Sequence, residues 1–243
     1  MLFITDLDGT LLDSSKVISD ANLTAIEHFV AAGGLFTIAT GRTEDTCRLA
    51  TDLLPINAPV ILYNGAVIMD LKNNHVLYQK TLEARLFRPI LQQIMSQFPD
   101  VCIELFAYGP LMLINPLAVM DPYITKEKQP FRYCELDSTP EFWLKIMLSA
   151  SHERLTKVQA FLKNLYAKTL PACTMMFSSD YYFEILNESC SKGNCAKWLA
   201  SWLSISMQEV AAIGDHLNDI DLLLCSGHSF SPANAHQSVK DIS

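Results

Sequence analysis

A short apolar run at the start of the chain leads directly into two closely spaced acids and a glycine. Residues 1–4 can form a buried strand, and Asp6, Asp8 and Gly9 follow it. At a spacing of two residues, both carboxylates point to the same side of an extended backbone. Because two like charges this close repel each other and lose hydration, they need a cation or a bound proton. With the sharp turn that Gly9 permits, this stretch predicts a site at the end of a strand.

Paired carboxylates at a strand end suit phosphoryl transfer through a carboxylate nucleophile. One aspartate would attack phosphorus and form an aspartyl-phosphate. The other would donate a proton to the leaving oxygen and later accept one from water. Mg²⁺ prefers oxygen ligands and would balance the clustered negative charge. An acidic turn without a function remains the alternative for this stretch alone, because turns favour Asp and Gly.

The charge balance limits the classes of partner. The 243 residues carry a net charge of −8 and contain no block of Lys and Arg, which disfavours nucleic acid. A negative protein also repels phosphate esters at long range, so a phosphate site must gather positive charge locally. No apolar run reaches the roughly 18 residues of a membrane span, and no signal-like segment begins the chain. Seven scattered cysteines without metal-ligand spacing indicate reduced thiols in a cytoplasmic protein.

The segment after the acidic turn predicts a strand–helix–strand unit. Ser19 can cap a helix with an apolar face, and the apolar residues 35–39 form a second strand that leads to Thr40-Gly41-Arg42. Such a unit makes a parallel sheet. Because ligands bind beyond the carboxyl ends of parallel strands, Asp6, Asp8 and Thr40 are expected to share one edge.

The middle of the chain has a different pattern of predicted secondary structure. Asn64-Gly65 between apolar runs predicts a hairpin, and residues 72–75 predict a second turn. From about residue 83 to 186, helix and strand patterns alternate in a way that indicates a separate α+β layer inserted into the first domain. Within this layer, residues 115–140 carry four prolines and little periodicity, which predicts a loop.

Two further segments near the C-terminal end can carry charge to the same site. Lys192-Gly193 begins a helical pattern, although a lone lysine there is also typical of a solvated surface. Residues 210–213 predict a buried strand that ends in a second acidic turn over residues 214–219. Asp219 can interact with the N-terminus of the helix that follows, and this interaction is compatible with facing a metal.

Four segments match the motif pattern of one family in the right order: residues 6–10, 40–42, 192–193 and 214–219. Together they resemble the haloacid-dehalogenase-like hydrolase superfamily, and the place of the inserted layer resembles its Cof-type sugar-phosphatase branch. The resemblance implies an α/β fold: a Rossmann-like, mostly parallel sheet with helices on both faces and an inserted α+β cap domain. It assigns residues 1–82 and 187–243 to the hydrolase core and residues 83–186 to the cap.

The resemblance also implies a role for each acidic position. Asp6 would be the nucleophile and Asp8 the general acid and base. Mg²⁺ would be bound by Asp6, by the main-chain oxygen of Asp8 and by Asp215. Asp219 would support the metal from the second shell of ligands through water or hydrogen bonds.

The remaining motif positions would handle the phosphate. Thr40 and the Gly41 amide would donate hydrogen bonds to the transferring phosphoryl oxygens. Lys192 would lie between the phosphate and Asp6 and supply positive charge, the main catalytic requirement of such reactions. Asn218 would orient Lys192 or the phosphate.

Two positions depart from the family pattern. His216 stands where a small or amide residue is usual; it is expected to be a neutral loop residue, and the alternative is that it tunes the pH dependence of the site. In the family, a further helix and strand usually follow the region that corresponds to residues 231–235. This chain ends at Ser243, soon after that region.

The resemblance therefore implies a Mg²⁺-dependent phosphatase, a phosphoric monoester hydrolase, acting on a small phosphorylated metabolite, with a sugar phosphate as the expected substrate. A dehalogenase would not need Asp8, and a phosphotransferring ATPase would carry a lysine–threonine pair where Leu7-Asp8 stands. A phosphomutase, or a catalytically silent ligand-binding or regulatory module, remains open. The expected partner is a small-molecule phosphate ester, without nucleic acid or membrane, and the sequence does not indicate the oligomeric state.

Overall fold

The computed structural model describes residues 1–115, 129–165 and 170–243. The chain forms two compact units, one of Met1–Gln79 with Cys190–Ser243 and one of Lys80–Ser189. The sequence predicts limits at residues 83 and 186 for the inserted domain. Within the described ranges, no helix has both the length and the apolar character needed to cross a membrane.

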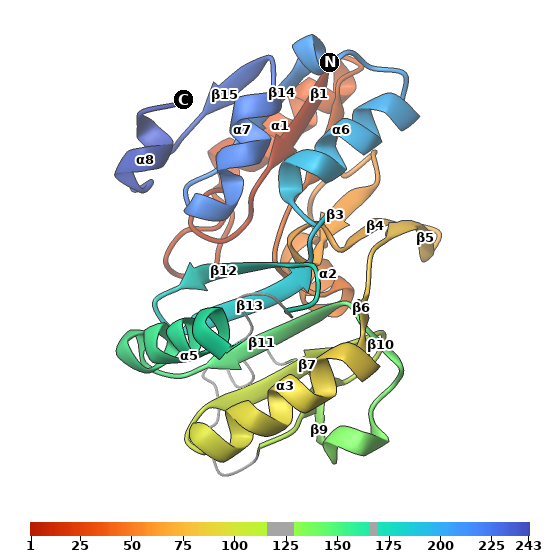
Figure 1. Cartoon of the computed structure of the whole chain (residues 1–243). Coiled ribbons are helices and arrows are strands. Elements are labelled where there is room, and N and C mark those ends of the chain that lie inside the picture. Colours follow the sequence, from red (N-terminus) through yellow and green to blue (C-terminus); the bar gives the residue numbers. More distant parts are fainter. Residues whose placement is uncertain (116–128, 166–169) are drawn as a thin grey trace. The chain divides into compact units, whose positions relative to one another are not determined.

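A four-stranded parallel sheet forms the centre of the first unit (Figure 1). Its strand order is β15-β14-β1-β2, so β1 lies between a strand from the start of the chain and one from near its end. Leu2 is in register with Leu35 on one side and with Val210 on the other. The strands are β1 (Leu2–Thr5), β2 (Leu35–Ile38), β14 (Val210–Ile213) and β15 (His228–Phe230).

Helices cover both faces of this sheet, as predicted. On one face Phe3 stacks on Phe36 and meets the edge of Phe29 in α1 (Asp20–Ala31), each at 6.1 Å between ring centroids. The residues that bury the other face are Leu2, Ile4, Val210 and Ala212 from the strands, packed against apolar side chains of α6 (Lys192–Trp202), α7 (Ile220–Cys225) and α8 (Gln237–Lys240). Alternation of side chains along β1 therefore assigns each face to its own helices.

Hydroxyl caps start the helices that lead away from the sheet. The Ser19 side chain accepts a hydrogen bond from the Asn22 amide at the start of α1, which confirms the predicted cap. Thr43 accepts one from the Thr46 amide in the same way at the start of α2 (Glu44–Thr51). Short 3₁₀ turns at Met207–Glu209 and Leu217–Asp219 precede β14 and α7.

The predicted Asn64-Gly65 hairpin is confirmed, with a wider turn than two residues. Leu62 of β3 (Val60–Leu62) pairs with Val67 of β4 (Val67–Asp70), and the 3₁₀ turn Tyr63–Gly65 joins them. β4 then pairs with β5 (His75–Gln79) across the second predicted turn. Asn64 has φ 54° and is buried, a conformation that Asn tolerates better than most residues.

The second unit contains a six-stranded sheet in the order β12-β13-β11-β7-β8-β9 and a separate β6–β10 pair. One face of the sheet packs against two amphipathic helices and buries an apolar core that includes Ile103, Ile146 and Phe183. The elements are β6 (Leu82–Glu83), α3 (Ala84–Gln97), β7 (Cys102–Phe106), β8 (Leu111–Leu113), β9 (Phe131–Tyr133), the 3₁₀ turn Leu136–Ser138, β10 (Phe142–Trp143), β11 (Lys145–Ser149), α5 (His152–Leu165), β12 (Cys173–Ser179) and β13 (Tyr182–Asn187).

The predicted loop over residues 115–140 is wrong at one place. Phe131–Tyr133 forms β9, which pairs in parallel with β8. Three exposed residues carry no periodic pattern, so only the tertiary pairing reveals this strand. Residues 116–128 of the same prediction lie outside the described residues.

Candidate active site

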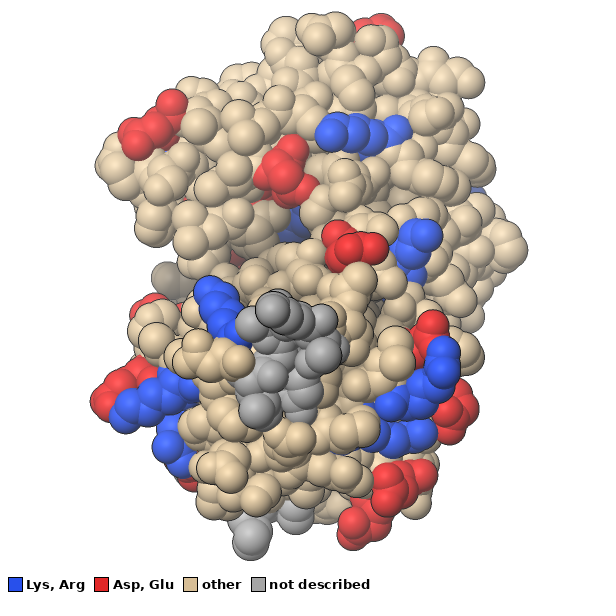
Figure 2. All heavy atoms as spheres, in the orientation of Figure 1, with Lys and Arg blue, Asp and Glu red and all other residues tan. Residues whose placement is uncertain are grey.

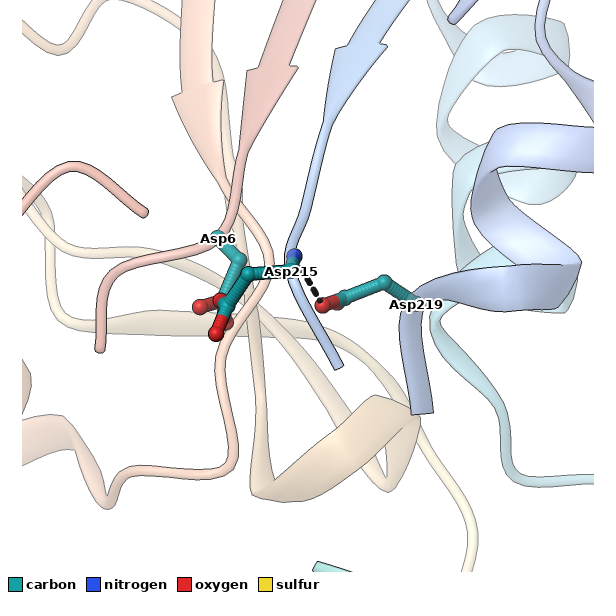
Figure 3. A group of neighbouring side chains, drawn as sticks. All are labelled: Asp6, Asp215 and Asp219. Atoms are coloured by element: carbon teal, nitrogen blue, oxygen red, sulfur yellow. Dashed lines mark hydrogen bonds between the residues drawn. The ribbon is translucent and has the colours of Figure 1, made fainter. Parts of the chain in front are cut away.

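The site lies at the carboxyl ends of β1 and β14. The Asp6 amide donates to the Ile213 carbonyl at 2.9 Å, so the two acidic turns begin side by side. Figure 3 shows the carboxylates of Asp6 and Asp215 converging, while Asp219 approaches from the start of α7. The predicted parallel sheet thus brings two distant acidic turns to one edge.

A buried lysine joins two of these acids. The Lys192 ammonium donates to Asp6 Oδ1 and to Asp219 Oδ1, each at 2.6 Å, and its side chain is only 1% exposed. Burial alone would lower the pKa of Lys192, but Asp219 and Asp6 raise it above its ordinary value. Burial raises the pKa of Asp6 to about 8, although Lys192 opposes that shift. The ammonium supplies the local positive charge that the acidic chain otherwise lacks.

Asp219 also shapes the loop that carries Asp215. Its Oδ2 accepts hydrogen bonds from the amides of Asp215 and His216, both at 3.0 Å. A Cβ atom at Gly214 would lie 2.5 Å from the Asp219 side chain, so the loop needs glycine for this close approach. One carboxylate therefore fixes both the lysine and the backbone beside it.

The Asp215 carboxylate is oriented by a hydroxyl from the first acidic turn. Thr10 Oγ1 donates to Asp215 Oδ1 at 2.6 Å, and the His236 amide donates to the Asp215 carbonyl at 2.9 Å. Burial raises the pKa of Asp215, and the Thr10 hydrogen bond opposes the rise. A cation bound beside Asp215 would oppose this rise, because a neighbouring positive charge favours the ionised carboxylate.

Asp6, Asp215 and Asp219 can each offer one carboxylate oxygen within 4.8 Å of the others. The donor set consists of oxygens alone, without histidine or cysteine, which fits a hard cation such as Mg²⁺. Because both oxygens of Asp219 already accept hydrogen bonds, Asp6 and Asp215 are better placed to bind directly. The residues present therefore fit a magnesium ion.

Asp8 is engaged by cations and does not join this cluster. Arg42 donates to it through Nε to Oδ2 and Nη2 to Oδ1, each at 2.8 Å, and Lys16 contacts Oδ1. Burial would raise the pKa of Asp8, but the hydrogen bonds from Arg42 and Lys16 hold it at about 2. Asp8 is a carboxylate in this arrangement, with its orientation set by a planar guanidinium.

Lys192 begins α6, and the other predicted phosphate-binding residues lie in two neighbouring loops. Thr40 is buried, and its hydroxyl accepts a hydrogen bond from the Arg42 amide at 3.2 Å. A Cβ atom at Gly41 would lie 3.0 Å from Asn64 Nδ2. Asn218 Nδ2 donates to Asn64 Oδ1 at 3.0 Å, which ties the second acidic turn to the hairpin. The Asn218 side chain thus contacts Asn64, whereas the family resemblance suggests Lys192 or the phosphate as its partner.

Four residues of the site are not identified by sequence reasoning alone. They are Thr10, Lys16, Arg42 and Asn64, which orient Asp215, Asp8 or Asn218. Arg42 and Asn64 lie within segments that the sequence does highlight, next to Thr40 and in the Asn-Gly turn. Lys16 carries no signal, because its contact depends on how the loop after Asp13 folds back.

His216 adjoins the acidic cluster through its main chain, whose amide donates to Asp219 Oδ2 at 3.0 Å. Its ring is 6.4 Å from that of His236, and within the described part of the chain its buried Nδ1 has no hydrogen-bond partner.

Positive charge is not gathered into one patch on the face drawn in Figure 2, as far as the described residues show. On the face drawn in Figure 2, acidic and basic side chains of the described residues are interspersed. The cations that meet the acids at the site are the individually placed Lys16, Arg42 and Lys192.

Comparisons with known proteins place the chain in a family. A family model described as haloacid dehalogenase-like hydrolase matches residues 3–243. The chain is 27% identical to the putative phosphatase YxeH of Bacillus subtilis, over 96% of the chain and 87% of the relative. It is 29% identical to the 5-amino-6-(5-phospho-D-ribitylamino)uracil phosphatase YwtE of Bacillus subtilis, over 97% and 88%.

A solved structure shows the same fold. The crystal structure of a haloacid dehalogenase-like hydrolase from Bacteroides thetaiotaomicron matches with a TM-score of 0.85 and 24% identity, over 100% of this chain and 91% of that one. These findings confirm the resemblance that the four motifs indicate and the α/β fold that it implies. The chain belongs to the haloacid dehalogenase-like hydrolases.

Proposed function

We propose that this hydrolase is a Mg²⁺-dependent phosphatase that acts on a small phosphorylated metabolite, with Asp6 as its nucleophile. The observation that carries the proposal is the buried Lys192, which donates to both Asp6 and Asp219 where two parallel strands end. A cation fixed against a nucleophilic carboxylate can neutralise the oxygens of a transferring phosphoryl group. Relatives whose names are phosphatases support the same reaction class.

The Asp6 carboxylate has one oxygen available for attack. Oδ1 accepts from Lys192, which leaves Oδ2 to form the bond to phosphorus while the bond to the leaving oxygen breaks. Water then attacks phosphorus, the Asp6–phosphorus bond breaks, and inorganic phosphate leaves. Lys192 remains between the reacting phosphoryl group and Asp219 in both steps and limits the build-up of negative charge.

Asp8 is the proposed acid and base. It would donate a proton to the leaving oxygen in the first step and accept one from water in the second. With a pKa of about 2, Asp8 is deprotonated at neutral pH and can therefore accept a proton. For the acid role, the negative charge of a bound phosphate ester would favour protonation of Asp8, because like charges raise a carboxyl pKa.

Magnesium would be held by Asp6 and Asp215, with the main-chain oxygen of Asp8 as a further ligand and Asp219 in support. When bound, Mg²⁺ supplies charge neutralisation and orientation of the phosphate. Thr10 keeps the Asp215 carboxylate directed at this position through its 2.6 Å hydrogen bond. Thr40, the Gly41 amide and Asn218 are proposed to bind the phosphoryl oxygens.

The proposed substrate class is a phosphate monoester of a small metabolite, with a sugar phosphate as the first candidate. Residues 83–186 are proposed to be the cap domain that selects the leaving group. The relative YwtE carries the name of a phosphatase for a phosphorylated ribityl compound, which supports a polyhydroxylated leaving group. Seven free cysteines support the predicted cytoplasmic location.

The test is turnover of 4-nitrophenyl phosphate and of a panel of sugar phosphates by the full chain with and without Mg²⁺. We expect Asp6→Asn to abolish turnover with the fold retained, and Asp180→Asn, an exposed acid of the inserted unit, to leave it unchanged. Turnover by Asp6→Asn would contradict the proposal. Isomerised sugar phosphate in place of inorganic phosphate would indicate a phosphomutase, and ligand binding without turnover would indicate a silent module.

A further inference from the structure

Two cations from different segments engage both oxygens of Asp8. Arg42 pairs with the carboxylate through two hydrogen bonds of 2.8 Å, one to each oxygen, and Lys16 adds a contact to Oδ1. A guanidinium that binds both carboxylate oxygens through parallel bonds holds the two groups close to one plane. The contacts therefore determine how the Asp8 carboxylate is rotated, as well as where it lies.

The two cations differ in how firmly they are held. The Arg42 side chain is 6% exposed, and its Nη1 donates to the Thr46 carbonyl at 3.1 Å. The Lys16 side chain is 51% exposed and stands on a short loop that Asp13 organises by accepting from two main-chain amides at 2.8 and 2.9 Å. An exposed lysine with a flexible stem adds less binding energy than a buried, bidentate arginine. Arg42 is therefore the more firmly held of the two cations, and Lys16 is the one that can change position.

Counting lone pairs shows which oxygen can exchange a proton. A carboxylate oxygen has two lone pairs. Oδ1 of Asp8 accepts from both Arg42 and Lys16, whereas Oδ2 accepts from Arg42 alone among the described residues. While both cations stay in place, a proton can bind only at Oδ2.

We propose that Arg42 and Lys16 are positioning residues that orient Asp8 so that its Oδ2 faces the oxygen that gains or loses a proton. The inference rests on the proposed phosphatase function and adds to it which residues govern proton transfer. A direct contact between Arg42 and the phosphate is the competing interpretation. It predicts a different pattern of loss, because phosphate binding affects every ester equally.

The test compares aryl phosphates of one shape whose leaving groups differ in their need for a proton. The esters are 2,4-dinitrophenyl, 4-nitrophenyl and phenyl phosphate, and kcat/KM is measured for Arg42→Lys and Lys16→Met in the presence of Mg²⁺. General acid catalysis contributes about 100-fold to 10,000-fold, so partial misorientation should cost about 10-fold to 100-fold with phenyl phosphate. With the dinitrophenyl ester, whose phenolate leaves unprotonated, we expect a loss under about threefold.

Matched controls use cations that do not contact Asp8. Arg48 donates to the Leu71 carbonyl at 2.6 Å, so Arg48→Lys removes a guanidinium contact elsewhere in the same unit. Lys72→Met removes an exposed lysine from the β4–β5 turn. Both should keep the wild-type dependence on leaving group. Added guanidinium should restore hydrolysis of phenyl phosphate by Arg42→Ala, because it can re-form the bidentate pair.

The outcomes separate the two proposals. Equal losses across the three esters, or no loss with either variant, would overturn the positioning role. If Arg42→Lys melts at a much lower temperature than the wild type, Lys16→Met decides the question alone, because Lys16 is exposed. A wild-type protein that hydrolyses neither these esters nor any of the sugar phosphates with Mg²⁺ would instead overturn the phosphatase function and this inference with it.

Discussion

Gly9 and Asp215 approach so closely that no side chain fits between them. A Cβ atom at Gly9 would lie 2.5 Å from Asp215 Oδ2. Gly9 also has φ +88°, a region that other residues enter only with strain. The first acidic turn can therefore close around the second only because it carries glycine.

Gly9→Ala should displace Asp215 and weaken metal binding. We expect the Mg²⁺ concentration for half-maximal activity to rise more than about 10-fold, because a carboxylate ligand loses its position. The strained backbone should also lower the free energy of unfolding by about 1–2 kcal/mol. Activity titrations with Mg²⁺ and urea unfolding measure the two effects.

Gly33→Ala is the matched control for that variant. Gly33 has φ +87°, but no atom lies within 4 Å of the position of its Cβ. The backbone strain should therefore appear with no change in the Mg²⁺ requirement. A similar rise in both variants would show that instability, and not the contact with Asp215, causes the effect.

Lys192→Met should destabilise the metal-free protein as well as stop turnover. It removes the cation that Asp6 and Asp219 share, and breaking a buried pair costs about 3–5 kcal/mol. Urea unfolding in EDTA measures the loss. Lys157→Met, which breaks an exposed pair with Glu153, should leave the free energy of unfolding nearly unchanged. Equal costs would mean that the buried pair contributes no more than a surface one.

The stability of the metal-free protein should fall between about pH 4 and pH 8 because of Asp6. Burial raises its pKa from 3.8 to about 8, so the folded protein binds this proton more tightly than the unfolded chain. That stabilisation is complete below the unfolded pKa and is lost as the pH rises through the folded one. Asp6→Asn removes the titration, so its unfolding free energy in EDTA should vary less over this range. A parallel decline in both proteins would assign the effect to other groups.

Thr10→Val should raise the Mg²⁺ requirement about 10-fold with little effect on stability. The substitution keeps the shape of the side chain but removes the hydroxyl that donates to Asp215 Oδ1. Partners of metal ligands typically contribute about 10-fold to 100-fold in affinity. Thr10→Ser should restore the requirement, whereas Thr156→Val, which loses an exposed bond within α5, should not alter it. Isothermal titration with Mg²⁺ provides a readout independent of turnover.

The sequence predicts the parallel sheet and the acids at its edge because both leave local patterns. Apolar strands that end in Asp6 or near Asp215 are readable from the order of residues alone. The side chains that contact these acids cannot be predicted from the order of residues, since the contacts depend on how distant segments come together. Lys16 reaches Asp8 only because its own loop turns back, and no pattern of residue types records that contact.

The inserted unit shows a second limit of prediction from the sequence. Residues 142–148 are almost all apolar in the sequence, but the structure divides them between two sheets. Trp143 pairs with Leu82, whereas Lys145 pairs with Phe106. Periodicity detects extended backbone and cannot tell which neighbour each residue will find. Likewise, no local pattern indicates that Glu184 is buried and accepts hydrogen bonds from Lys145 and Ser178.

The strand order of the parallel sheet has a consequence for how the protein is made. β1 receives its partner β2 early in synthesis, but its other edge pairs with β14, at Val210–Ile213. Until that segment leaves the ribosome, a growing chain exposes an unpaired strand edge, which invites association with other chains. Asp6, which follows β1, also lacks its contacts at this stage, because Lys192 and Asp219 are translated late. The nascent polypeptide is therefore expected to be inactive and prone to aggregation until residues 192–219 have emerged from the ribosome.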